Sequence, residues 1–297
     1  MKERFVPLIH INCPPEIKCQ KCISVVSSAS IQQLHIAVMY ALDGVSEDNK
    51  EFFNILVKDQ NIIPHLASPI IQFVSQSQLN KKKIQQQQQY SDSFEQYFIY
   101  PSQILINKLI NNNTKARKQI INTPNFLNSL IKLTEFKFNN DTNKEEDNQS
   151  KQIRNESRIC LRIIHRYGNE QVQVELVTNR YPRVLVIDIN TAGGNEQLDK
   201  EISQGLYSII DFIREILRGR RQTHQDFNPG LSFPPQPVLF KSCQEQIEDE
   251  GANEEIEAQL VNKREGPGYY MDEANWAKGS ILNIFIDNRN PQPQWYK

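Results

Sequence analysis

Four potential metal ligands gather near the start of the chain. His10, Cys13, Cys19 and Cys22 follow the spacing H-x2-C-x5-C-x2-C. Four nitrogen and sulfur donors suit a tetrahedral zinc ion. The pattern departs from a usual zinc knuckle, because no glycine follows Cys22 and only one close Cys-x-x-Cys pair is present. The alternative is that Cys19 and Cys22 are small buried apolar residues on a helix starting near Glu16, in a protein without a cofactor.

A stripe of basic side chains is the second candidate site. Arg154, Arg158, Arg162 and Arg166 lie four residues apart, so they share one face of a helix. Such a stripe is suited to contact an acidic peptide, a phosphate or RNA. The alternative is a solvated face, neutralised by nearby glutamates or by the chain's own acidic stretch from Glu245 to Glu257.

Catalytic signatures are missing from the sequence. It contains no Gly-x-Ser-x-Gly, phosphate-binding loop or His-Glu-x-x-His motif. Apart from His10, the histidines form no pair at the spacing of a metal site or triad, and His35 and His65 are expected as hydrogen-bonded core or groove residues. We therefore expect a protein that is not an enzyme.

Composition limits the expected core size, the charge of possible partners and the cellular compartment. The 297 residues are enough to bury a sizeable core, although apolar residues make up only 38% because of Asn- and Gln-rich insertions. A net charge of -1 gives no overall attraction to nucleic acid or anionic membrane. No run approaches the roughly 18 apolar residues of a membrane span, and the first residues do not resemble a signal peptide. Five cysteines fit a reducing compartment, so we expect an intracellular, cytoplasmic protein.

The elements that position these residues are helices. Between Leu42 and Ile70 the pattern predicts the end of one helix, a polar turn at 46–49 and two further helices separated by a break at 59–61. Pro64 is tolerated because it falls in the first turn of the last helix. The pattern then returns twice, with Asn113 and Asn169 as counterparts of Asn49. Self-similarity on this scale predicts an α-solenoid.

The same residues resemble the armadillo repeat family, whose unit has a helix ending near an Asn, a short helix and an Ile-Pro-x-Leu entry to a third helix. Here these are Asn49 and Ile63-Pro64-His65-Leu66, with looser counterparts at Thr123–Phe126 and Tyr181–Val184. The resemblance covers roughly residues 30–190. It implies an all-α, armadillo-like α-solenoid of about three repeats, against the alternative of an irregular helical bundle.

Two domains are expected. Residues 1–221 form the helical domain, with repeats at 31–75, 94–138 and 153–190, low-complexity insertions at 76–93 and 139–152, and a capping helix at 196–221. Two glycines in 191–195 are expected to end the third repeat. The arginines at the end of the capping helix are expected as favourable cations at its C-terminus: Arg214, Arg218, Arg220 and Arg221.

The second region, residues 222–297, is expected to be an extended tail that is rich in Pro and Gly, acidic and aromatic. Its prolines predict a strap over 227–240, residues 244–263 are acidic and weakly helical, and Ile281–Ile286 is typical of a short strand. Its aromatic residues have no evident core of their own. Trp276, Phe285 and Trp295 are therefore expected to dock on the solenoid or on a partner.

The function expected from these patterns is a non-catalytic scaffold or adaptor within a larger protein assembly. Small armadillo proteins with tails resemble structural parts of ciliary axoneme or radial-spoke complexes, so a cilium or cytoskeletal location is one expectation. The alternative is an RNA-associated adaptor, because the order of the repeats also looks like the armadillo-type subunit of the mRNA deadenylase complex. That subunit has a longer N-terminal portion and lacks this tail. A zinc-dependent interaction module built on residues 10–22 is a third alternative.

Overall fold

The computed structural model describes residues 6–26, 28–45, 50–81, 92–137, 144–189, 199–221, 230–261 and 269–282. Every long element in these ranges is an α-helix, which confirms the all-α class predicted from the sequence. No helix of the described chain is long and apolar enough to cross a membrane. The chain divides into two compact units, Met1–Ile164 and His165–Lys297, rather than at the predicted boundary after Arg221.

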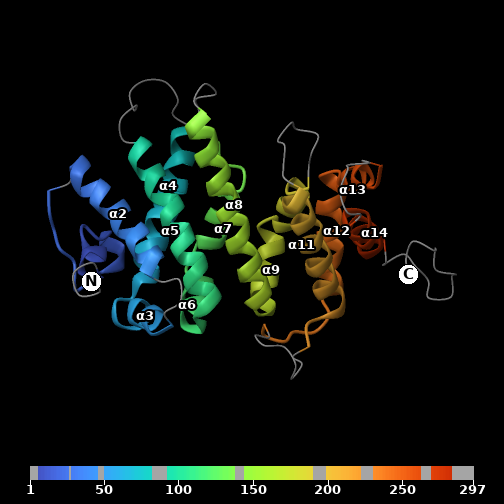
Figure 1. Cartoon of the computed structure of the whole chain (residues 1–297). Helices are drawn as coiled ribbons and strands as arrows, with labels where there is room; N and C mark the ends of the chain where they lie inside the picture. Colours follow the sequence, from blue (N-terminus) through green and yellow to red (C-terminus); the bar gives the residue numbers. More distant parts are fainter. Residues whose placement is uncertain are drawn as a thin grey trace. The chain divides into compact units, whose positions relative to one another are not determined.

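The first unit contains two complete three-helix repeats. The first consists of α2 (Ala29–Val45), α3 (Lys50–Asn54) with its π-helical continuation η3 (Ile55–Asp59), and α4 (Ile62–Lys81). The second consists of α5 (Asp92–Asn112), α6 (Thr114–Ile121) and α7 (Phe126–Leu133). Corresponding helices pack on each other, α5 on α2, α6 on η3 and α7 on α4 (Figure 1). This stacking of like on like is the organisation of a helical solenoid.

The apolar face predicted for the second helix of the first repeat is buried. Phe52, Phe53, Leu56 and Val57 all lie in the core. Asn61 adopts a left-handed conformation with φ of 48°, which separates η3 from α4. Pro64 then falls in the first turn of α4, as expected.

The recurring asparagines cap the short second helices. Asn113 accepts hydrogen bonds from the backbone N–H groups of Lys115 and Ala116 at the start of α6. Asn169 accepts one from Val172 at the start of α9 (Glu170–Thr178). Each side chain satisfies a donor that the helix itself leaves unpaired. The remaining counterpart, Asn49, lies outside the described residues.

The insertions predicted between the repeats are partly helical. α4 continues to Lys81, and α5 begins at Asp92, inside the predicted 76–93 loop. α8 (Lys144–Tyr167) likewise begins within the predicted 139–152 insertion. Its first residues are polar, but Glu, Lys and Gln are good helix formers, so polarity alone was a poor sign of a loop. Residues 82–91 and 138–143, and the glycines expected to end the third repeat, lie outside the described residues.

The third repeat is completed by α9 and α10 (Tyr181–Ile187), and α11 (Asp199–Arg218) follows. The predicted apolar stripe of α11 is buried at Ile202, Leu206, Ile209, Ile210 and Ile213. However, α11 is not the last packing helix, because both α12 (Pro237–Asp249) and α14 (Tyr269–Leu282) pack against it.

The prediction of an extended tail is therefore wrong for most of its described part. Three helices, α12, α13 (Ala252–Val261) and α14, occupy it. Pro237 stands in the first turn of α12, where a proline favours rather than breaks a helix. Only the described residues 230–236 remain extended, with Phe233 bridged to Arg220. The predicted strand at 281–286 is also wrong at its start, since Ile281 and Leu282 end α14, and the rest lies outside the described residues.

Candidate metal centre

The N-terminal ligands are carried by a closed loop rather than by a helix. The 3-10 turn η1 (Val6–His10) leads into a loop that ends at Ile23. The Ile23 N–H donates to the His10 carbonyl at 2.7 Å, and the Asn12 N–H donates to the Ile23 carbonyl at 3.0 Å. The helix expected from Glu16 is only the three-residue turn η2 (Pro15–Ile17), because left-handed Lys18 ends it. Both turns pack on α4 of the first repeat.

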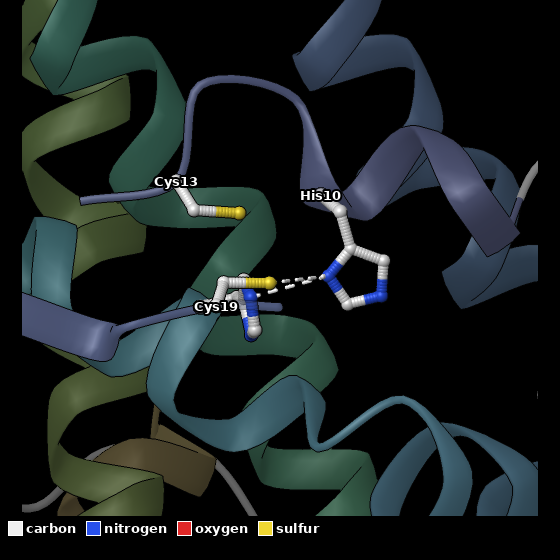
Figure 2. Close-up of side chains that lie close together, drawn as sticks. His10, Cys13 and Cys19 are labelled. Carbon is white, nitrogen blue, oxygen red and sulfur yellow. Dashed lines mark hydrogen bonds between the residues drawn. The ribbon is translucent and has the colours of Figure 1, made fainter. Parts of the chain in front are cut away.

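Four side chains converge where this loop meets α4. His10, Cys13 and Cys19 come from the loop, and His65 comes from the first turn of α4. Their ligand atoms all lie within 4.8 Å of one another. The sulfur atoms of Cys13 and Cys19 point toward the His10 ring (Figure 2). The Cys19 sulfur lies 3.3 Å from His10 Nδ1, and His65 Nε2 lies 3.2 Å from the same nitrogen.

The outer nitrogens of both imidazoles are hydrogen-bonded to oxygen. His65 Nδ1 lies 3.0 Å from the Asn61 carbonyl. His10 Nε2 lies 3.1 Å from Gln60 Oε1, an atom that also accepts a hydrogen bond from the Lys21 ammonium. Burial lowers the pKa of His65, and neighbouring His10 lowers it further, although the bond to Asn61 opposes this. Burial thus favours the neutral form of His65, and neutral imidazole is the form of histidine that binds metals.

Cys22 is not one of the four converging residues. Its side chain is exposed, whereas Cys13 and Cys19 are half-buried and both histidines are buried. Cys22 nevertheless influences Cys13. Burial raises the pKa of the Cys13 thiol most, and hydrogen bonds with Cys19 and Cys22 raise it further. His65 thus takes the place that the sequence assigned to Cys22. No spacing rule could have paired His65 with a histidine 55 residues away.

The arginine stripe is not a uniform exposed surface. Arg154 is buried, and its guanidinium donates to the Phe136 carbonyl at 2.8 Å, so its prediction as a partner contact is wrong. Arg158 and Arg162 are half-buried, and Arg166 is exposed. Outside the stripe, Arg183 pairs with Glu250 of the acidic stretch at 2.7 Å.

Of the three aromatic residues predicted to contact partners, the structure describes Trp276 alone. It lies on α14 and is 45% exposed. Phe285 and Trp295 lie outside the described residues.

A partly buried carboxylate on α8 gives a test of the packing between repeats. Glu156 accepts a hydrogen bond from Asn107 of α5 at 2.7 Å. Burial, which outweighs this bond, raises the pKa of Glu156, with nearby Asp43 adding to the effect. A pKa that is higher in the folded state means that this carboxylate lowers stability as pH rises through the window above 4.5, its ordinary value.

We expect Glu156→Gln to be more stable than the wild type at pH 7, since the amide still accepts from Asn107 without carrying a buried charge. The difference in melting temperature should shrink as the pH falls to about 4, where the wild-type carboxyl is protonated as well. Exposed Glu51 of α3 supplies the control, because Glu51→Gln should show no such gain. A stabilisation independent of pH would contradict this explanation.

A polar cluster in the second unit was also missed by the sequence analysis. Arg220 had been expected simply as a cation at the C-terminus of α11. Instead, its guanidinium donates to the carbonyls of Gly168 at 2.9 Å and His165 at 2.8 Å, and to Glu215. Gly230 lies so close that a Cβ there would meet Arg220 Nη1 at 2.5 Å. Arg220 therefore joins the end of α8, the end of α11 and the extended strap.

Comparison with known proteins does not assign this chain to a family. No known family and no curated protein matches the chain. Among solved structures, a crystal structure of an engineered protein matches with a TM-score of 0.45 and 14% sequence identity, covering 86% of this chain and 93% of that chain. A likeness of this degree assigns neither an ancestry nor an activity.

Proposed function

We propose that the protein is a non-catalytic scaffold or adaptor that binds other subunits of a larger protein assembly. The observation that carries this proposal is the like-on-like stacking of the first two repeats, α5 on α2, α6 on η3 and α7 on α4. In such an array each repeat is stabilised by its neighbours, and the outer helix faces form an extended surface for a partner. The armadillo resemblance supports the same function.

Trp276 is the described residue that best fits a partner contact. A large aromatic side chain that is 45% exposed on a helix is of the kind that contributes most to protein–protein binding energy. Val238 of α12 is more exposed still, at 86%. Both belong to the second unit, and we therefore expect the partner contact in that unit.

Affinity purification with crosslinking mass spectrometry on the full-length chain tests this function. We expect stoichiometric partners whose crosslinks map to the second unit, and we expect Trp276→Ala to abolish their recovery. The matched control is Tyr207→Ala on α11, which removes an aromatic side chain of similar exposure, 46%. Failure to recover any stoichiometric partner from the native source would contradict the scaffold proposal. Equal loss in both variants would contradict the role of Trp276.

The RNA-associated alternative is supported by Arg166, which is exposed, and by half-buried Arg162 one turn earlier on α8. It requires an RNA affinity that falls steeply with salt and falls further in Arg162→Ala and Arg166→Ala. For the protein scaffold, the resemblance to small armadillo proteins makes cytoplasmic assemblies, ciliary axoneme complexes among them, the first to test. This rests on analogy of fold alone.

A further inference from the structure

We propose that His10, Cys13, Cys19 and His65 bind one zinc ion, which fastens the N-terminal loop to the first helical repeat. Sequence alone offered Cys22 as the fourth ligand, and the structure replaces it with a histidine from α4. A two-cysteine, two-histidine set is typical of structural zinc. The proposal is independent of the scaffold function, because it concerns how the first repeat is completed.

The hydrogen bonds outside the cluster orient both imidazoles toward its centre. A backbone carbonyl only accepts, so His65 Nδ1 carries the proton donated to Asn61, and Nε2 keeps its lone pair. The Lys21 ammonium only donates, which identifies the shared atom of Gln60 as the amide oxygen. His10 Nε2 must then donate to Gln60, and its Nδ1 keeps the lone pair. Bonds of this kind orient the histidine ligands of metal sites.

The two lone pairs therefore face each other across 3.2 Å. Two acceptors at this distance repel unless a proton or a cation lies between them. A proton would place an unpaired positive charge on two imidazoles that are both buried, which is costly. A zinc ion shared with two thiolates carries no net charge, so it satisfies both lone pairs at a smaller cost of desolvation.

The distances also fit a tetrahedral ion. Two nitrogens bound to zinc at about 2.0–2.1 Å are about 3.3–3.4 Å apart, and a bound nitrogen and sulfur are about 3.5 Å apart. The structure gives 3.2 Å between the histidine nitrogens and 3.3 Å between the Cys19 sulfur and His10 Nδ1. The four atoms lie within 4.8 Å of one another, so small shifts of these atoms suffice to form a tetrahedral site.

Zinc in this site would be structural. With four protein ligands no coordination position remains for water or substrate, in contrast to catalytic zinc. Three ligands come from a loop that has little helical structure of its own, and the fourth comes from the first turn of α4. Binding therefore couples the fold of residues 10–23 to the first repeat.

The first test is the metal content of the full-length protein, purified with a non-chelating reductant. We expect about one zinc per chain, as for a single four-ligand site. His65→Gln and Cys19→Ser should lower zinc affinity, measured by competition with a chromophoric chelator, by more than about 100-fold. Gln60→Ala, which removes only the outer partner of His10, should lower it about 10- to 100-fold. Cys22→Ser is the matched control and should bind like the wild type.

Several results would overturn the proposal. Zinc that is lost in Cys22→Ser but kept in His65→Gln would show the sequence-predicted ligand set instead. Absence of zinc after loading with Zn²⁺, or bound iron in its place, would exclude a zinc site. Should His65→Gln fail to fold, as judged by circular dichroism, Gln60→Ala retains all four ligands and still decides the question. Removal of zinc should also lower the melting temperature of the wild type but not of Cys19→Ser.

Discussion

Arg220→Ala is expected to destabilise the second unit by about 3–5 kcal/mol, the usual cost of removing one partner from a buried charged network. Arg220 is buried, and its guanidinium is the partner of two carbonyls at the end of α8. Alanine would leave those carbonyls without this donor. It would also leave Glu215 with His165 as its remaining partner at 3.2 Å.

The backbone around Arg220 makes compensation difficult. Gly219 is left-handed with φ of 72°, and Arg220 exchanges two backbone hydrogen bonds with Phe233 of the strap. The guanidinium also lies 5.0 Å from the centre of the Phe233 ring. A simple shift of the strap therefore cannot compensate for a smaller side chain at position 220. Lysine should restore only part of the stability, since it cannot span both carbonyls and Glu215 with a planar fork.

Urea unfolding followed by tryptophan fluorescence measures this effect, because both tryptophans fall within the range of the second unit. Arg214→Ala removes an exposed arginine from the same helix and should change stability by no more than about 0.5 kcal/mol. If Arg220→Ala were as mild as this control, the joining role of Arg220 would be wrong.

Phe240→Ala is expected to cost the second unit about 3–5 kcal/mol, because it empties a fully buried site in α12. Phe240 lies on the face of α12 that also buries Cys243 and Ile247. The helix packs against α9, α10 and α11. Removal of everything after Arg221 should have a larger effect still, since it would expose the faces of α11 that α12 and α14 cover.

The matched control for Phe240→Ala is Val238→Ala, two residues earlier in the same helix. Val238 is 86% exposed, so its truncation should change stability by no more than about 0.5 kcal/mol. Chemical unfolding of both variants measures the two stability changes and so shows whether α12 is docked. Equal stability of the two variants would mean that α12 is not docked against the rest of the second unit.

The repeats could be predicted from sequence because their signals are local. Asn113 and Asn169 recur where a short helix needs a cap, and Pro64 marks the first turn of another. Each signal acts within one helical turn, so it can be recognised without knowledge of the tertiary fold. The same holds for the apolar stripe of α11.

The composition of the C-terminal region hides most of its helical structure, of which only residues 244–263 were expected to be weakly helical. The region is rich in proline and acidic residues, which favours an extended or disordered chain. Yet Phe240, Cys243 and Ile247 already show the spacing of one helical face, and Pro237 stands where a helix can begin. These two local signals would have predicted α12.

The fourth residue of the candidate metal centre could not be predicted in this way. His65 looked like a core or groove residue within an Ile-Pro-His-Leu helix entry, and its neighbours in sequence include no other ligand. Only tertiary packing brings α4 against the loop that carries His10 and the cysteines. The loop itself was not predicted. Its sequence suggested a helix, whereas Asn12 and Lys18 adopt left-handed conformations that interrupt one.

In the proposed zinc site, three ligands of the N-terminal loop and one histidine of α4 bind a single ion. Zinc K-edge X-ray absorption on the purified full-length chain identifies these ligands. We expect two sulfur ligands at about 2.3 Å and two imidazole nitrogens at about 2.0–2.1 Å. A shell of three sulfurs would contradict this ligand set by pointing to Cys22, and a shell of oxygen and nitrogen alone would show that the cysteines bind no metal.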